Sequence, residues 1–277
     1  MLLTDGQVHL WDPPTPEAPL LIERSTPQRP GGFTATQCLA EMTAAGVDRA
    51  VIVPPGWAPN GNRQAQRYAA ENPGKFAIMG RLDITAAGWR EELEGWLQQP
   101  HMVGARVSIS GPYFEKWLDL PEMDEFWGRC ERLGIPCMIL LPGRAKEFVP
   151  IATAHPGLTI IVDHMARLVP EGGPERWLDL DDLLALARFP NVIVKTSSAP
   201  NYSLERYPYA DIHPHLRRIY DAFGPQRMAW GSDITRLRGP YADCARLFTE
   251  GLTFLTAADR EWVLGKTIAT ALKWPEA

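Results

Sequence analysis

The sequence lacks the features that mark secreted, membrane-spanning or disulfide-rich proteins. No stretch reaches the 18 or more consecutive apolar residues that a membrane-spanning helix needs. The first residues contain no basic segment followed by an apolar core, which is the pattern of a secretory signal. Only four cysteines occur, and they form no CxxC pair. We therefore expect a cytoplasmic protein whose cysteines are buried thiols.

An excess of basic charge is also missing. The 28 Lys and Arg residues are outnumbered by 33 Asp and Glu residues, for a formal net charge of −5. Nucleic acids and anionic membranes bind to basic faces, so neither is an expected partner. The expected partner is instead a small molecule, and self-association into a homo-oligomer stays open.

Several signatures of well-known enzyme classes do not occur. The chain has no GxSxG elbow, no HExxH helix, no GxxxxGK[ST] phosphate loop and no GxGxxG turn. A two-carboxylate glycosidase would need a second acid near Asp233, and only Asp83 could supply it. The chemistry must therefore be sought in other polar residues.

The sequence does contain a regular alternation of short apolar runs with longer helical patterns. We expect strands at residues 7–10, 49–54, 76–82, 103–109, 136–141, 159–164, 192–197 and 228–232. The expected helices cover 34–45, 63–71, 89–98, 121–133, 180–187, 212–223 and 257–272. About eight strand–helix units indicate a parallel sheet closed into a (β/α)8 TIM barrel, a single domain of residues 1–277 with an extra C-terminal helix. An open doubly wound sheet is the alternative, but it usually begins with a glycine-rich turn that this chain lacks.

Polar side chains at the ends of the expected strands are the candidates for chemistry, because barrel active sites lie there. Gln7 and His9 are two residues apart and share one face of the first strand, unless this strand is an exposed edge. In the sixth strand Asp163 and His164 are adjacent, so alternation lets only one of them point inward. We expect His164 inside and Asp163 outside, as a partner of the next helix or loop. A hydrogen-bonded core histidine is the structural alternative.

Asp233 ends the eighth expected strand, and the small residues Ala229 and Gly231 share its face. This leaves room for a substrate to approach the carboxylate, which is a natural general base. The alternative role is that of a helix N-cap, but Ser232 could fill it. Asp233 is therefore the candidate base.

Four cations near the same strand ends predict an anionic substrate. Arg106 and Lys195 interrupt apolar strands, where charge is costly unless it is paired or hydrated. Arg167 and Arg236 each follow a candidate catalytic residue by three positions. Guanidinium groups match carboxylates in shape and charge. Each cation could instead form an ion pair with an acid such as Asp163.

Five motifs occur in order along the chain: Asp5-Gly-Gln-Val-His9-Leu-Trp, Gly104-Ala-Arg106-Val, Val162-Asp-His164-Met-Ala-Arg167, Val194-Lys195 and Trp230-Gly-Ser-Asp233. Together they resemble the amidohydrolase superfamily, and more narrowly its amidohydrolase-2 branch. That branch holds sugar lactonases, 2-pyrone-4,6-dicarboxylate lactonase and related hydrolases and decarboxylases. The resemblance, which extends to Trp274, implies a (β/α)8 barrel that hydrolyses a small cyclic ester or amide.

The resemblance also implies roles for individual residues. Asp233 matches the general base that takes a proton from the attacking water. His9 and His164 match inward histidines that polarise the scissile carbonyl, and Arg106 and Arg167 match arginines that grip substrate carboxylates. Arg106 therefore counts with Asp233 and the two histidines as a catalytic candidate. The other candidate substrate contacts are Gln7, Trp57, Lys195, Tyr202 and Arg236.

One departure from the family pattern concerns metal. Metal-dependent members begin with a His-x-His pair, and the first of these positions is Gln7 here. The fifth strand ends in Leu140 and Leu141 rather than in a histidine. His9, His164 and Asp233 remain as ligands for one Zn²⁺ or Mn²⁺, which is about the number a catalytic zinc needs. We expect no cofactor, because glutamine is a poor zinc ligand and the pyrone dicarboxylate lactonase works without metal.

Four hypotheses about activity remain open. The first is a metal-independent hydrolase of a small anionic lactone, and the second adds a zinc or manganese ion. The third is an isomerase or decarboxylase on the same scaffold. The fourth is a barrel that has lost catalysis and only binds a small ligand.

Overall fold

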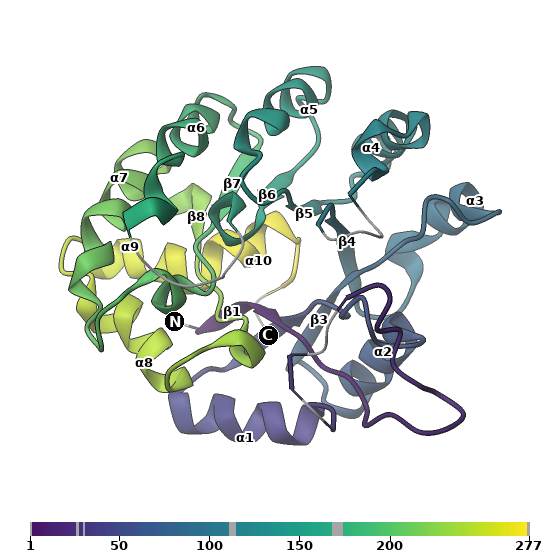
Figure 1. The fold of residues 1–277 in the computed structure, drawn as a ribbon, viewed down its shortest axis with the longest axis horizontal. Coiled ribbons are helices and arrows are strands. Elements are labelled where there is room, and N and C mark those ends of the chain that lie inside the picture. The colour runs from purple at the N-terminus through teal and green to yellow at the C-terminus, as the bar shows by residue number, and fades with distance from the viewer. Residues whose placement is uncertain (1, 26–27, 30, 111–114, 168–173, 276–277) are drawn as a thin grey trace.

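The computed structural model describes residues 2–25, 28–29, 31–110, 115–167 and 174–275. Within these residues, eight parallel strands pair in sequence order from β1 to β8, and helices surround them (Figure 1). The strands are β1 (Thr4–Val8), β2 (Arg49–Ile52), β3 (Phe76–Gly80), β4 (Met102–Ser108), β5 (Cys137–Leu140), β6 (Ile160–Val162), β7 (Val192–Lys195) and β8 (Met228–Ala229). The expected (β/α)8 barrel is confirmed.

The helices are α1 (Ala35–Ala45), α2 (Gly61–Glu71), α3 (Trp89–Glu94), α4 (Pro121–Leu133), α5 (Phe148–Ala154), α6 (Leu180–Leu184), α7 (His213–Phe223), α8 (Tyr241–Arg246), α9 (Ala257–Glu261) and α10 (Thr267–Ala271). The sequence did not predict α5 or α8, which are only seven and six residues long. The expected C-terminal helix is confirmed as α9 and α10, joined by a π-helical turn at Trp262–Lys266.

The ends of two helices, α1 and α4, follow local rules that the sequence displays. α1 begins after Thr34, which forms a capping box with Gln37. It ends at Gly46, whose φ of 71° lies in the left-handed region that glycine tolerates. α4 likewise begins with Pro121 and ends at Gly134, with φ of 66°. These signals explain why both helix boundaries were predicted well.

The barrel closes where β1 meets the segment after β8. The Gly6 amide donates to the Trp230 carbonyl (3.2 Å), and the Asp233 amide donates to the Gln7 carbonyl (3.0 Å). A Cβ atom on Gly6 would lie 2.5 Å from the Trp230 oxygen, so this contact requires glycine. The buried Asp5 carboxylate adds hydrogen bonds from the Ser232 amide (2.8 Å) and the Tyr241 hydroxyl (2.8 Å).

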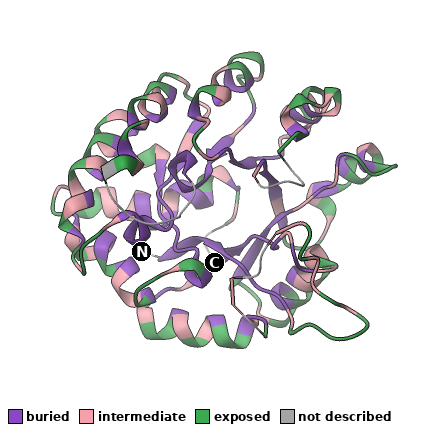
Figure 2. Ribbon diagram, viewed as in Figure 1, coloured by how far each residue is buried: buried purple, intermediate pink, exposed green. Residues whose placement is uncertain are grey.

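The core has two parts, one outside and one inside the barrel, and Figure 2 shows the strands buried between them. The outer part fills the space between strands and helices and includes Ile160 and Val162 of β6. The inner part combines inward residues of the barrel strands with two residues of the C-terminal helix: Val51, Val53, Met79, Met138, Ile161, Ala229, Ile268 and Leu272. Its last two members belong to α10 and the residue after it, so the C-terminal helix packs against the inner core.

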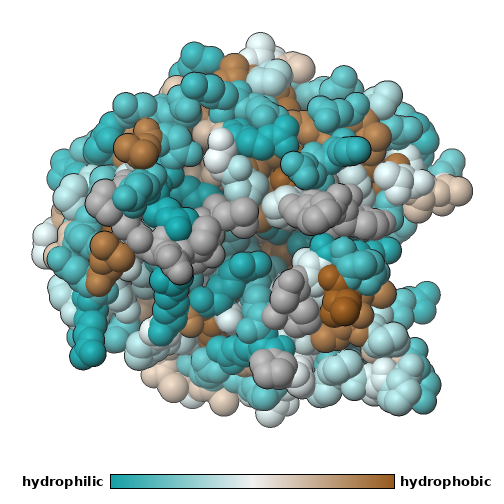
Figure 3. Space-filling model, in the orientation of Figure 1, coloured by the Kyte–Doolittle hydropathy of each residue, from teal (hydrophilic) through white to brown (hydrophobic). Residues whose placement is uncertain are grey.

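The surface is mostly polar. On the face shown in Figure 3, hydrophobic atoms are scattered among hydrophilic ones. The exposed large hydrophobic side chains of the described segments are Ile22, Leu178 and Leu204. None of the helices described here combines the length and the apolar character needed to cross a membrane.

Candidate active site

Two cavities adjoin at the C-terminal ends of the strands. The smaller, which we call the catalytic pocket, has a volume of about 70 Å³ and is lined among others by His9, Trp57, His164, Arg167, Asp233 and Arg236. The larger, which we call the side cavity, has a volume of about 460 Å³ and is lined by residues that follow β2 and β3. Arg81, Arg106 and Ser108 line both cavities.

The Gln7 carboxamide lies between the two histidines. Its Nε2 atom is 3.3 Å from Nε2 of His9 and 3.1 Å from Nε2 of His164. Its Oε1 atom accepts a hydrogen bond from the Lys195 ammonium group, which has no acceptor to offer. The amide oxygen therefore faces Lys195 and the NH₂ group faces the histidines. Gln7 and His9 share the inner face, as their spacing predicted.

Both histidines are neutral in this arrangement. Burial lowers the pKa of His9 well below its usual value and lowers the pKa of His164 to about 3. A neutral imidazole carries one proton, and each Nε2 accepts from the Gln7 amide. The proton is therefore on Nδ1, which donates to the Val53 carbonyl from His9 (2.6 Å) and to the Ser197 hydroxyl from His164 (2.7 Å).

Asp233 presents its carboxylate to this histidine pair. The side chain is fully buried, 3.4 Å from Nε2 of His9 and 3.8 Å from Nε2 of His164. Neither carboxylate oxygen has a hydrogen-bond partner among the described residues. Asp233 does precede a helical turn, Ile234–Arg236, but its side chain forms no cap hydrogen bond there. The N-cap alternative is therefore excluded, and the carboxylate is free to act in the pocket.

The prediction that Asp163 points outward is wrong. Asp163 is buried inside the barrel, with ion pairs to Nε of Arg106 (2.6 Å) and Nζ of Lys195 (2.5 Å). These cations lower the pKa of the Asp163 carboxyl despite its burial. Ile161 is the inward residue of β6, and alternation then turns Asp163 inward too. His164 faces the same pocket because its backbone is left-handed, with φ of 47°.

Lys195 was expected among the cations that bind an anionic substrate at the strand ends, but it lines neither cavity. Its side chain is fully buried beneath Gln7 and against Met138. The ion-pair alternative therefore holds for Lys195. It also holds in part for Arg106, but Arg106 still lines both cavities, and its Nη1 has no hydrogen-bond partner in the described segments.

The remaining candidates surround the pocket at different depths. Arg167 is buried and binds the Asp179 carboxylate and the Arg176 carbonyl. Arg236 is partly exposed, with Nε 3.3 Å from an Asp233 oxygen. Trp57 lines the pocket with its ring edge-on to His9, at a centroid distance of 5.9 Å. Tyr202 is buried behind His164 and donates a long hydrogen bond of 3.4 Å to its carbonyl.

Sequence reasoning missed two residues of the site. Arg81 directly follows β3, and its sequence signal was a cation at the end of an apolar run. Ser197 follows β7 and orients His164, but a serine after a strand has no distinctive sequence signal. Asp83, the conceivable second acid of a glycosidase, instead accepts hydrogen bonds from the Thr85 amide and hydroxyl.

The Gln7 amide contacts the histidine nitrogens that a divalent ion would need. In the described part of the chain, no group of three or more His, Cys, Asp or Glu side chains is arranged to hold a metal. An ion bound by His9 and His164 would take their Nε2 lone pairs, which already accept from the Gln7 amide. Gln7 would have to leave before such an ion could bind.

Comparison with known proteins gives one curated relative of similar length. The chain is 24% identical over 212 residues to the L-fucono-1,5-lactonase of Burkholderia ambifaria. The aligned region covers 73% of this chain and 70% of that protein.

Solved structures share the fold over nearly the whole chain. An amidohydrolase from Burkholderia multivorans, solved with bound zinc, superposes with a TM-score of 0.80 at 19% identity, covering 99% of this chain and 100% of that one. A probable 2-pyrone-4,6-dicarboxylic acid hydrolase from Acinetobacter baumannii, with citric acid bound, gives 0.77 at 16% identity, with the same coverage. The amidohydrolase family profile matches residues 4–274. The chain therefore belongs to the amidohydrolase family, and its barrel is that of a hydrolase.

Proposed function

We propose that this protein hydrolyses a small, negatively charged lactone by general-base catalysis without a metal ion. The observation that carries the proposal is the Asp233 carboxylate, which is buried, accepts no hydrogen bond from the described residues, and faces the catalytic pocket beside two neutral histidines and Arg236. The similarity to a lactonase supports the substrate class. The four buried, unpaired cysteines support a cytoplasmic location.

The proposed reaction begins with a water molecule held by Asp233. The carboxylate takes a proton from the water while the oxygen of that water attacks the lactone carbonyl carbon. The ring C–O bond then breaks, and the leaving oxygen takes the proton back from Asp233. The products are a carboxylic acid and an alcohol on one open chain.

The charge that grows on the carbonyl oxygen requires nearby donors. His9 and His164 each commit their one N–H group to another acceptor, so they hold the pocket and do not donate to this oxygen. Arg106 and Arg236 line the pocket and carry positive charge, and we assign them this stabilising role. Arg167, whose guanidinium is bound to Asp179 and lies over the Trp177 ring, forms part of the pocket wall.

Replacing the base tests the mechanism directly. Asp233→Asn keeps the shape of the side chain but cannot accept the proton, so we expect kcat to fall about 10²–10⁴-fold. Steady-state kinetics on a panel of lactones measures this, and a thermal melt checks that the variant folds. A variant that keeps most of its activity would show that Asp233 is not the base. Identifying the product by mass and NMR separates hydrolysis from isomerisation or decarboxylation.

Metal dependence is tested by elemental analysis together with chelation. We expect the purified protein to contain far less than one equivalent of zinc and to stay active in chelator, because the Gln7 amide occupies the position between the histidines. Gln7→His provides the matched comparison, since it replaces the amide by an imidazole, and this variant should bind zinc more tightly. Stoichiometric zinc in the wild type, with activity lost on chelation and restored by metal, would contradict the proposal.

A further inference from the structure

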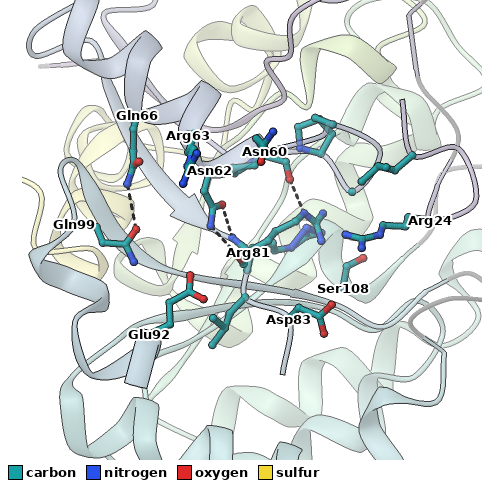
Figure 4. Close-up of a pocket in the computed structure, with 18 of the residues that line it drawn as sticks. Arg24, Asn60, Asn62, Arg63, Gln66, Arg81, Asp83, Glu92, Gln99 and Ser108 are labelled. Atoms are coloured by element: carbon teal, nitrogen blue, oxygen red, sulfur yellow. Dashed lines mark hydrogen bonds between the residues drawn. The ribbon is translucent and has the colours of Figure 1, made fainter. Parts of the chain in front are cut away.

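The side cavity is larger than the catalytic pocket and joins it at Arg81 and Arg106. Its wall is formed by the loop after β2, the first turns of α2, the ends of β3 and β4, and single residues from other segments, among them Arg24 after β1 and Glu92 of α3. Figure 4 shows polar side chains on all sides of this space. Its volume of about 460 Å³ is enough for a further group of a substrate whose ring lies at Asp233.

Arg81 is held rigidly on the wall of this cavity. Its backbone amide donates to Oδ1 of Asn62 (2.9 Å), and Nδ2 of Asn62 donates back to the Arg81 carbonyl (2.8 Å). Its Nε donates to the Pro54 carbonyl (2.5 Å). Three hydrogen bonds thus fix the residue through its backbone and Nε. The guanidinium is directed to the same side of the cavity as Arg24 and Ser108 (Figure 4).

The ends of these guanidinium groups are short of negative charge. Among the ion pairs of the described residues, none involves Arg81, and the buried Nη1 of Arg106 has no hydrogen-bond partner there. Asp163 is shared between Arg106 and Lys195. Burial and the neighbouring Arg106 lower the pKa of Arg81 to about 9.

The acids on the cavity wall do not correct this imbalance. Asp83 accepts hydrogen bonds from Thr85, and among the described residues it forms no ion pair with Arg81 or Arg106. Glu92 lies on the opposite side of Arg81, with Gln66 and Gln99 (Figure 4). Holding guanidinium groups together without an anion is unfavourable, and a planar fork binds an oxyanion through two parallel hydrogen bonds.

We propose that the side cavity binds an oxyanion, a carboxylate or a phosphoryl group, on an arm of the substrate, and that Arg81 and Arg106 hold it beside the Ser108 hydroxyl. This inference rests on the proposed function, which places the lactone ring at Asp233, and adds a second site at which the same substrate is recognised. Arg81 is then the residue that selects substrates with a charged arm.

Binding of small anions tests the subsite without any turnover. Succinate and inorganic phosphate are titrated into the wild type and into Arg81→Met, which keeps an unbranched side chain up to about the position of Nε but removes the charged guanidinium end. We expect the affinity for the anion that fits to fall about 10- to 100-fold, as the loss of a charged bidentate contact implies. The anion that loses affinity identifies the group as carboxylate or phosphoryl. Unchanged affinity for both anions would overturn the proposal.

Two further arginine substitutions serve as a control variant and as a conservative variant of Arg81. Arg217→Met removes an equal charge from the exposed face of α7, where Arg217 pairs with Asp221, and should leave both affinities at the wild-type value. Arg81→Lys keeps the charge but lacks the fork, so we expect roughly a tenfold loss. If Arg81→Met fails to fold, wild-type affinity in Arg81→Lys would overturn the proposal.

Kinetics separate failure of the subsite from failure of the proposed function. The ratio of kcat/KM for a lactone with a charged arm to that for its neutral analogue should fall about 10- to 100-fold in Arg81→Met. An unchanged ratio would overturn the subsite while lactone hydrolysis stands. If the wild type opens no lactone, the proposed function fails, and the anion titrations still decide the subsite.

Discussion

Gln7 joins the charged interior of the barrel to the histidines of the pocket. One end of its carboxamide accepts from Lys195, and the other end donates to the Nε2 atoms of His9 and His164. An amide offers two N–H donors and carries no net charge. It can therefore donate a hydrogen bond to each imidazole while both imidazoles remain neutral.

The neutral histidines predict a pH dependence of stability. In the unfolded chain each histidine binds a proton below about pH 6.5, whereas burial keeps the pKa of His164 at about 3 and that of His9 well below its usual value. The unfolded state therefore gains protons that the native state does not. Above about pH 6.5 the two histidines do not lower the free energy of unfolding. As the pH falls below about 6.5, each histidine lowers it by up to about 1.4 kcal/mol per pH unit.

Urea unfolding between about pH 7 and pH 5 measures this effect. His164→Asn should show a shallower loss of stability than the wild type over this range. His101→Asn is the matched control, because His101 is exposed and asparagine tolerates its φ of 62°. Equal slopes in the wild type and in His164→Asn would contradict the prediction.

At the scale of secondary-structure elements, β6 decides how the site is assembled. This strand has only three residues, all of them buried and apolar. By alternation, an inward His164 implies that Ile160 and Val162 also point inward, whereas the barrel places Ile161 inside. The shift by one residue brings Asp163 to Arg106 and Lys195. A strand that is apolar on both faces shows no alternation of polar and apolar residues, so its sequence does not indicate which of its residues face the barrel interior.

At the scale of the whole molecule, the barrel depends on close contact between its first and last strands. Gly6→Ala would place a Cβ atom 2.5 Å from the Trp230 carbonyl oxygen, so one of the two segments must move. We expect a loss of roughly 1–3 kcal/mol in the free energy of unfolding. Activity should fall as well, because the same contact positions Gln7 and Asp233. Chemical denaturation and lactone kinetics measure the two effects.

Gly128→Ala is the control for this substitution. Gly128 lies within α4, and a Cβ atom there would meet its nearest neighbour, a His155 ring carbon, at an ordinary distance of 3.7 Å. Alanine favours a helix over glycine by up to about 1 kcal/mol, so this variant should be as stable as the wild type or more so. A Gly6→Ala variant as stable as Gly128→Ala would show that the strands close without this constraint.

The order and type of most elements could be predicted from the amino-acid sequence, because alternating apolar runs and helix-end signals are local. It also indicated that Gln7, His9, His164 and Asp233 could meet, since strand ends converge in a barrel. The three-dimensional fold was needed to establish which charges neutralise one another, that Lys195 contacts Gln7, and that Arg81 faces a second cavity. Those facts depend on the phase of each strand and on distances between segments far apart in the chain, which local patterns do not contain.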